Sequence, residues 1–235
     1  MSVQGERAMP QKIPEAIIER LPVYQRHLTE LAYRGIEKIS SVELATKVGI
    51  TDVQIRKDLN WFGSLGLKGY GYRVEELLHQ INQILGLSDT ITMVLIGGGN
   101  LGRALINYPG FQDEHFMIKA VFDSNLTVIN NNVNGLTVYP ITFLKDYLKQ
   151  NSIRIGIIAT LMHGIQEVVD VLIDGGVQGI WNFVPENIKV PSFITVENVN
   201  IIESLMILSY KCKSRYPRLE KTGIRKIKER IDQPS

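Results

Sequence analysis

Cysteine is nearly absent from this chain: its 235 residues include one, Cys212, together with four histidines and two tryptophans. One cysteine cannot close a disulfide within the chain, and with four dispersed histidines it matches no zinc-ligand spacing. Long apolar runs are also missing, because no window reaches the ~18 uninterrupted apolar residues of a membrane span. The N-terminus lacks the apolar segment of a secretory signal. We therefore expect no disulfide, no metal, no membrane span and a reducing, cytoplasmic location.

Net charge is small, +2 overall, but it is unevenly distributed. Residues 1–75 carry 11 Lys or Arg against 9 Asp or Glu, residues 76–210 carry 6 against 12, and residues 211–235 carry 9 against 3. Nucleic-acid contacts are therefore expected at the basic flanks. For the basic tail, residues 217–235, a flexible solvated segment is the main expectation, and sequence-blind, salt-dependent DNA affinity is the addition to test.

Three helical patterns fill the first part of the chain. The first covers residues 13–35 and keeps one face apolar. The second starts at a capping box on Ser40 and ends at Gly49. The third covers residues 51–62. A short helix, a tight glycine turn and a second helix match the helix-turn-helix unit, whose second helix enters the major groove of DNA.

Periodicity divides the third helix into a buried and an outward face. Steps of 100° place Ile55, Leu59 and Phe62 on one buried stripe. In the major groove Gln pairs with adenine and Lys with guanine, whereas Arg56 suits a phosphate. A solvated face of a small helical domain is the alternative. The predicted base readers are Val53, Gln54, Lys57 and Asn60.

Glycines punctuate residues 63–74 in the manner of a β-hairpin. Basic and aromatic side chains are interleaved there, so that the hairpin can act as a wing that inserts a cation into the minor groove. A further amphipathic helix over residues 75–87 follows. We place the resulting winged-helix domain at residues 1–86. The predicted wing contacts are Lys68, Tyr70 and Tyr72, beside Arg73.

A glycine motif follows a buried-strand pattern at residues 91–96, and its spacing is G-x-G-x-x-G from Gly97 to Gly102. The first glycine permits a tight turn, the second lets the backbone approach a pyrophosphate, and the third allows close helix–strand packing. A second strand ends at Asp123, which can bind a ribose hydroxyl and favours NAD over NADP; a strand-end cap is the alternative. The predicted cofactor-binding residues here are Gly97, Gly98, Gly99, Asn100, Leu101, Gly102 and Asp123.

Helices and strands continue to alternate after this motif, which indicates parallel βαβ units. The fold class is therefore α/β: an N-terminal winged helix-turn-helix domain plus a Rossmann-like parallel-sheet domain, residues 87–198. The predicted helices are Pro140–Gln150 and Ile165–Asp174, and the predicted strands are Ile153–Thr160, Gly179–Phe183 and Val190–Val196.

A catalytic group does not stand out in the sequence. A dehydrogenase places a His, Lys or Tyr beside a carboxylate, and none of His27, His79, His115 and His163 has an acid at a telling spacing. His163 follows a strand, where open α/β folds bind ligands, so it is the one catalytic candidate. We expect no enzyme. The alternatives are an NAD-dependent oxidoreductase with a regulatory front end and a coenzyme A- or nucleotide-binding module.

Together these motifs resemble those of the Rex family of redox-sensing bacterial transcriptional repressors. The resemblance implies NAD(H) as cofactor, with Thr160 and Tyr108 at its site, and a homodimer that binds a palindromic double-stranded DNA operator and releases it when NADH binds. It also implies a C-terminal helix, residues 199–216, swapped between subunits; packing of that helix on its own subunit is the alternative. The similar segments are Lys12–Ala16, Gln54–Leu59, Phe62–Gly63, Gly97–Leu105, Tyr108–Phe111, Asn182–Pro185 and Val196–Val199.

Two positions depart from the family's pattern. Members carry Asp near the swapped helix, poised to pair with an Arg and a Tyr; the corresponding residues here are Asn200, Arg26 and Tyr108. Asn cannot form the ion pair, and a neutral hydrogen bond contributes about 1 kcal/mol. Thr160-Leu-Met-His163 stands where members have Val-Pro and small residues beside the nicotinamide. We therefore expect DNA and nucleotide binding to persist with a blunted or retuned NADH response.

Overall fold

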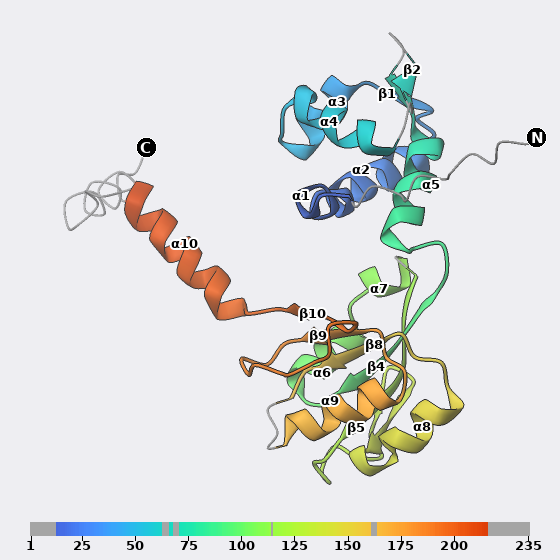
Figure 1. Ribbon diagram of the computed structural model, residues 1–235, viewed down its shortest axis with the longest axis vertical. Helices are drawn as coiled ribbons and strands as arrows, with labels where there is room; N and C mark the ends of the chain where they lie inside the picture. Colours follow the sequence, from blue (N-terminus) through green and yellow to red (C-terminus); the bar gives the residue numbers. More distant parts are fainter. Residues whose placement is uncertain (1–12, 63–65, 68–70, 114, 161–163, 216–235) are drawn as a thin grey trace, which may run out of the picture. The chain divides into compact units, whose positions relative to one another are not determined.

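The computed structural model describes residues 13–62, 66–67, 71–113, 115–160 and 164–215 (Figure 1). The chain divides into two compact units, Met1–Thr90 and Ile91–Ser235. Near the predicted boundary at residue 86, Leu87 is buried and its N–H donates to the Asn82 carbonyl at 2.8 Å. Each unit is described by itself below.

Helices make up most of the first unit. The prediction of one continuous helix over residues 13–35 was wrong. Pro22 lies in the first turn of the second helix, where proline has no N–H to donate to the preceding turn and its ring obstructs that turn. The helical segments are α1 (Glu15–Ile18), α2 (Leu21–Tyr33), α3 (Ser41–Val48), α4 (Asp52–Leu59), the 3₁₀ turn η1 (Asn60–Phe62) and α5 (Val74–Leu85).

The ends of α3 and α4 confirm the predicted helix-turn-helix. Ser40 Oγ accepts from the Glu43 N–H at 3.1 Å and Glu43 Oε2 accepts from the Ser40 N–H at 2.8 Å, which completes the capping box. Gly49 ends α3 with φ of +78°, a left-handed conformation that glycine adopts without strain. Thr51 Oγ1 then accepts from the Gln54 N–H at 3.2 Å and starts α4. Local sequence therefore fixes both helices and the turn between them.

A small antiparallel sheet completes the first unit. Its strands β1 (Lys38–Ile39), β2 (Gly66–Leu67) and β3 (Gly71–Arg73) lie in the order β1-β3-β2. The β2–β3 pair confirms the predicted hairpin, whereas β1 is too short to show a pattern in the sequence. Side chains from α2, α3, α4 and α5 form the core beside this sheet, including Leu21, Tyr24, Leu28, Leu44, Ile55, Leu59, Val74, Leu77 and Ile81.

A seven-stranded sheet organises the second unit, in the order β10-β9-β8-β4-β5-β7-β6. All neighbouring strands are parallel except β6 and β7. This topology confirms the predicted Rossmann-like fold, with β4 at the centre between β5 and β8 (Figure 1). The strands are β4 (Ile91–Ile96), β5 (Phe116–Asp123), β6 (Asn132–Val133), β7 (Leu136–Pro140), β8 (Ile155–Ile158), β9 (Gly179–Asn182) and β10 (Thr195–Asn198).

The β6–β7 hairpin was not predicted, although the sequence carries a signal for it. Asn134 and Gly135 connect the two strands with φ of +50° and +85°. Asn-Gly is the preferred pair for a two-residue hairpin turn with both residues at positive φ. Two further predictions were shifted: Pro140 ends β7 and does not open a helix, and the last strand starts at Thr195, not at Val190.

Helices flank the strands of the second unit. Their inward side chains, together with β4, β5 and β8, bury a core that includes Val94, Ile96, Phe122, Ile158, Val169 and Leu172. The predicted helix Ile165–Asp174 is confirmed as α9. The segments are α6 (Asn100–Ile106), α7 (Gly110–Asp113), the 3₁₀ turn η2 (Ile141–Phe143), α8 (Leu144–Gln150), α9 (Ile165–Asp174) and α10 (Ile201–Arg215).

The last helix, α10, has an unusual surface. Every described side chain from Ile201 to Ser214 is exposed. Seven of these side chains are large and apolar, from 54% exposed at Leu208 to 72% at Tyr210. The described part of the chain contains no helix long and apolar enough to cross a membrane. The large apolar side chains of α10 are Ile201, Ile202, Leu205, Met206, Ile207, Leu208 and Tyr210.

Candidate nucleotide and DNA sites

In the glycine loop between β4 and α6, the surroundings of a side chain differ from one glycine of the motif to the next. Gly97 has φ of +113°, and a Cβ there would lie 2.8 Å from the Ala159 carbonyl oxygen. A Cβ on Gly102 would overlap the carbonyl oxygen of Gly97, so α6 packs closely on the turn. By contrast, no heavy atom of the described residues comes within 4 Å of a Cβ built on Gly99. The side of the loop at Gly99 is thus open, as a pyrophosphate requires.

Asp123, at the end of β5, holds this loop in place. Its side chain is 7% exposed. One carboxylate oxygen, Oδ2, accepts from the Gly98 N–H at 2.7 Å, and the other, Oδ1, accepts from the Asn125 N–H at 2.8 Å. Each carboxylate oxygen has two lone pairs, so one on each stays available to a ribose hydroxyl. Asp123 therefore caps its strand, and its predicted contact with a ribose stays a prediction.

The same contacts change what is expected of Gly98. Its N–H is committed to Asp123, so it is not an open donor for phosphate. The N–H groups in the first turn of α6, among them those of Asn100 and Leu101, have no partner within the helix. Asn100 is exposed and Leu101 half-buried. Anion binding at this loop would therefore use the amides that follow Gly98, and Gly98 would act through Asp123.

The remaining predicted cofactor residues lie near the ends of β8 and α6. Thr160 follows β8, is half-buried, and brings its Cβ within 2.8 Å of the position that a Cβ on Gly97 would occupy. Tyr108 is 60% exposed and packs edge-to-face on Phe111, with ring centroids 5.4 Å apart. Met162 and His163 lie outside the described residues. Thr160 thus lies next to the glycine loop, whereas Tyr108 is exposed on the surface.

Asn200 has a local role that its sequence position did not reveal. Its Oδ1 accepts from the N–H groups of Ile202 and Glu203 at 3.1 and 3.2 Å, which makes it the N-cap of α10. Its Nδ2 donates to Glu203 Oε1 at 2.7 Å. Arg26 is an exposed residue of α2, in the other unit. The predicted contact of Asn200 with Arg26 and Tyr108 therefore stays a prediction.

The predicted faces of α4 are largely confirmed. Ile55 and Leu59 are fully buried, and Lys57 and Asn60 are exposed, as is Val53 at 48%. Arg56, the predicted phosphate contact, is exposed and forms an ion pair with Asp52 at 2.6 Å and a hydrogen bond with Ser41 at 3.3 Å. Gln54 is different, because it is half-buried and its Nε2 donates to Asp58 Oδ1 at 2.7 Å.

Asp58 is the main residue that sequence reasoning missed. It is 1% exposed, and Arg20 donates to it through Nε at 2.7 Å and through Nη2 at 2.8 Å. Tyr24 Oη donates to Asp58 Oδ2 at 2.6 Å. Burial acts to raise the pKa of Asp58, but the hydrogen bonds from Arg20, Tyr24 and Gln54 outweigh it and hold that pKa below its ordinary value. The pKa of the Tyr24 hydroxyl shifts the other way: burial raises it, and so does the hydrogen bond to Asp58.

One predicted wing residue, Tyr72, has a buried side chain. Tyr72 is 8% exposed and belongs to the core of the first unit, because alternate residues of β3 face opposite sides and Tyr72 takes the inner one. Its neighbour Arg73 is exposed and pairs with Glu76 at 2.6 Å. Lys68 and Tyr70, the other two predicted contacts, lie outside the described residues.

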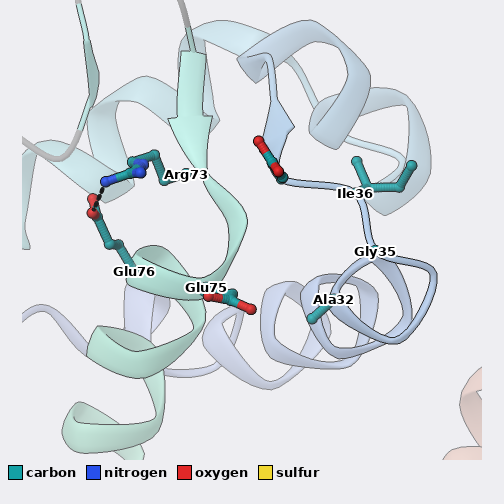
Figure 2. A pocket seen from close by; sticks show the side chains of 7 residues that line it. Ala32, Gly35, Ile36, Arg73, Glu75 and Glu76 are labelled. Carbon is teal, nitrogen blue, oxygen red and sulfur yellow. Dashed lines mark hydrogen bonds and ion pairs between the residues drawn. The ribbon is translucent and has the colours of Figure 1, made fainter.

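A concave surface of the first unit is unsuited to nucleic acid. Among the described residues, this cavity of about 460 Å³ is lined by three carboxylates and one basic residue, Arg73, which is paired with Glu76 (Figure 2). The remaining acidic charge would repel phosphate groups. Its lining residues are Ala32, Gly35, Ile36, Glu37, Arg73, Glu75 and Glu76. Among the described residues, no three His, Cys, Asp or Glu side chains are grouped to hold a metal ion.

Comparisons with known proteins agree with this two-part organisation. A family profile described as "Putative DNA-binding protein N-terminus" matches residues 12–60, and one described as "CoA binding domain" matches residues 88–186. The redox-sensing transcriptional repressor Rex of Clostridium perfringens strain SM101 is 45% identical over 198 residues, which cover 84% of this chain and 93% of the relative. Rex of Clostridium botulinum strain Hall is 44% identical over 197 residues, covering 84% of this chain and 94% of the relative. The chain belongs to the Rex family.

Solved Rex structures show the same fold. The structure of RSP in complex with β-NAD⁺ and operator DNA superposes with a TM-score of 0.82 at 38% identity, covering 91% of this chain and 99% of that one. RSP in complex with β-NADH superposes with a TM-score of 0.78 at 38% identity, covering 87% of this chain and 96% of that one. Likeness to Rex thus extends over both units, and it favours neither an oxidoreductase nor an isolated coenzyme A-binding module.

Proposed function

We propose that this chain is a redox-sensing transcriptional repressor, not an enzyme, which binds operator DNA through its first unit and NAD(H) through its second. The observation that carries the proposal is the identity of 44–45% to Rex repressors over nearly their whole length. The helix-turn-helix of α3 and α4 and the glycine loop beside Asp123 provide the two binding elements. Because bacterial operators lie in the cytoplasm, the chain would act there.

The nucleotide site would be formed by the glycine loop, the first turn of α6, Asp123 and Thr160. Amides at a helix start bind pyrophosphate, and the free lone pairs of Asp123 accept from ribose hydroxyls. The charge of Asp123 disfavours the extra phosphate of NADP. NAD⁺ carries a positive, planar ring and NADH a neutral, puckered one, so an apolar site around that ring can distinguish the two. Tyr108, whose side chain is exposed, is proposed to face the bound nucleotide in the assembled protein.

The DNA site would be the exposed face of α4. Val53, Gln54, Lys57 and Asn60 are proposed to contact bases, and Arg56 a phosphate, since N-terminal residues of a recognition helix meet base edges. To reach a phosphate, Arg56 would leave Asp52, to which it is paired in this structure. Lys68 and Tyr70 are proposed to complete the contact from the wing. Tyr72 is not included, because its side chain is buried.

A homodimer is proposed because the described residues of the chain do not cover the apolar side chains of α10. A soluble helix buries its apolar side chains against another element, and each fully buried Leu or Ile contributes about 1.5–3 kcal/mol. The exposed side chains of α10 do not support the alternative in which this helix packs on its own subunit. A second copy that exchanges the helix would bury them. Two-fold symmetry then requires a palindromic operator.

The switch would follow from a difference in affinity. NADH can release DNA only if it binds the released conformation more tightly, and a ~100-fold preference corresponds to about 2.7 kcal/mol. Asn200, Arg26 and Tyr108 are proposed to stabilise that conformation. Because Asn200 is neutral, its hydrogen bonds would contribute less than those of the family's Asp, and Met162 and His163 would narrow the ring pocket. The NADH response is therefore proposed to be weaker than is usual in the family.

One experiment tests these proposals together. Binding of the full-length chain to operator DNA is measured with NAD⁺, with NADH and with neither, at one fixed salt concentration. Binding with NAD⁺ or without nucleotide, and release by NADH, would support the repressor. Equal binding under all three conditions would contradict redox sensing, whereas the NADH concentration at half-release measures how far the response is blunted. Turnover of NADH with a carbonyl substrate would favour the oxidoreductase instead.

A further inference from the structure

Gln54 occupies an unusual position on α4, since it belongs to the proposed DNA-facing side but is anchored from within. It is the third residue of the helix, and its backbone N–H is already bound by the Thr51 side chain at 3.2 Å. Its side-chain Nε2 donates to Asp58 Oδ1, one turn further along, at 2.7 Å. The amide of Gln54 is therefore bound before any DNA arrives.

The chemistry of Asp58 determines which end of that amide faces inward. Arg20 and Tyr24 direct three further hydrogen bonds onto the Asp58 carboxylate, at 2.6–2.8 Å. A carboxylate held by a guanidinium and a hydroxyl donor stays ionised, and an ionised carboxylate accepts hydrogen bonds but donates none. If the Gln54 amide were turned over, its Oε1 would face this negative charge. Only Nε2 can face Asp58.

This fixed orientation leaves a defined pair of groups for the groove: Oε1, which is an acceptor, and the second N–H of Nε2, which is a donor. Adenine presents the complementary pair, since its N6 amine donates and its N7 accepts. Guanine presents two acceptors, O6 and N7, and thymine presents O4, so both would set an acceptor against Oε1. We infer that the Arg20–Tyr24–Asp58 cluster fixes the amide of Gln54 and so makes it a reader of adenine at one position of each operator half-site.

Tyr24 and Asp58 act as positioning residues, because they are removed from solvent, and the half-buried Arg20 acts through Asp58. Tyr24 is fully buried and Asp58 is 1% exposed, so neither presents a group to a groove. They connect the recognition helix to the start of α2 and leave only the side chain of Gln54 for contact with a base. This inference rests on the proposed binding of DNA by α4.

The test begins with the full-length wild-type chain and its Gln54→Leu variant, each used to select duplexes from a library with randomised half-sites, at fixed salt and with NAD⁺. The position whose preference is lost in Gln54→Leu is the one that Gln54 reads. There the wild type should prefer adenine over guanine by at least about tenfold. An inosine–cytosine pair, which replaces the N6 amine by a carbonyl oxygen, should weaken wild-type binding by a similar factor.

The cluster is then altered in two ways. The side-chain amide introduced by Asp58→Asn can either donate or accept, so the Gln54 amide can turn over, and the adenine-to-guanine ratio should fall to within about threefold. Should Asp58→Asn fail to fold, the triple variant Arg20→Met, Tyr24→Phe, Asp58→Leu replaces the polar cluster by apolar side chains, a change that folded proteins often tolerate. It should relax the same position. Lys57→Ala is the matched control, which should lower affinity and leave that ratio unchanged.

The outcomes separate the two levels of the argument. If the wild type selects no duplex, the proposed function fails and the inference fails with it. If the wild type selects a duplex but the position that Gln54 reads holds guanine or thymine, the inference alone is overturned. It is equally overturned if Gln54→Leu changes no position, or if the base ratio persists in a folded variant that lacks the cluster.

Discussion

Each unit of this chain buries one carboxylate at its proposed binding element, and the two are held by different partners. Asp58 in the first unit is bound by the Arg20 guanidinium, a tyrosine hydroxyl and a glutamine amide. Asp123 in the second unit is bound by two backbone N–H groups. Asp58 is paired with a cation, whereas the described partners of Asp123 are uncharged. The comparison predicts that a buried carboxylate with a cationic partner fixes other groups, and that one whose described partners are amides is left to recognise a ligand.

The largest effect is expected from Asp58→Ala. This change leaves the half-buried Arg20 guanidinium and the buried Tyr24 hydroxyl without their partner, and breaking an ion pair whose carboxylate alone is fully buried costs about 3 kcal/mol, the lower end of the range for buried pairs. Urea unfolding followed by fluorescence of Trp61, in a Trp181→Phe background, measures the first unit. The second unit should keep its stability, as followed through Trp181 in a Trp61→Phe background. A loss below about 1 kcal/mol in the first unit would show that Asp58 is not an essential partner.

A smaller effect, on binding, is expected from Asp123→Asn. Asn can still accept from one amide N–H but has lost the charge that favours a ribose hydroxyl, and a hydrogen bond to a charged group contributes about 1.5–3 kcal/mol. NADH affinity should therefore fall about tenfold or more in a calorimetric titration. The ratio of the affinity for NADH to that for NADPH should also decrease. Asn125→Ala is the control, because Asn125 binds Asp123 through its backbone. Unchanged NADH affinity in Asp123→Asn would leave Asp123 as a strand cap only.

Acid should affect stability through Asp58. Its folded-state pKa lies below the value of about 3.9 for an unfolded Asp. The stabilisation that ionised Asp58 gives to the folded state is therefore present above about pH 4 and is lost as pH falls through the folded-state pKa. The stability difference between wild type and Asp58→Asn should stay constant from about pH 7 to pH 5 and shrink below about pH 4. A difference that grows toward acid would contradict the sign of the shift.

The smallest effect on stability is expected from Asn200→Asp, which places a carboxylate at the start of α10. Asp caps as well as Asn and interacts favourably with the helix dipole by about 0.3–1 kcal/mol, but it loses the hydrogen bond to Glu203 and gains repulsion from it. Net stability should change by less than about 1 kcal/mol. The NADH concentration that releases DNA should fall, since Asp can pair with Arg26. An unchanged release midpoint would remove Asn200 from the switch.

Local signals in the sequence were sufficient for much of the fold. Ser40, Thr51 and Gly49 define α3 and α4 through caps that depend on neighbours a few residues away. Mainly apolar runs and the glycine motif defined β4 and β5. Asn134-Gly135 carried an equally local signal for β6 and β7 that was overlooked, and Pro22 marked a break between α1 and α2.

The remaining features depend on contacts between distant residues. Arg20 and Asp58 are 38 residues apart in the chain, so their pairing follows from tertiary packing and from no local pattern. A carboxylate next to the apolar stripe of α4 was the available signal, because a buried charge requires a partner. Tyr72 was predicted to contact DNA because aromatic and basic residues are interleaved in residues 63–74. A three-residue strand is too short for its alternation to show which side chains are buried. The commitment of the Gly98 amide to Asp123 likewise depends on two strands meeting in the sheet.

Under the proposed homodimer, the exposed apolar side chains of α10 would make the thermal stability of this protein depend on its own concentration. If these side chains are buried only against a second copy, folding and association are one equilibrium, and the melting temperature rises with protein concentration. Serial dilution would then lower the melting temperature. A newly synthesised chain would expose the apolar side chains of α10 until it associated with a second copy. Cells that make little of the protein would lose it sooner to proteolysis.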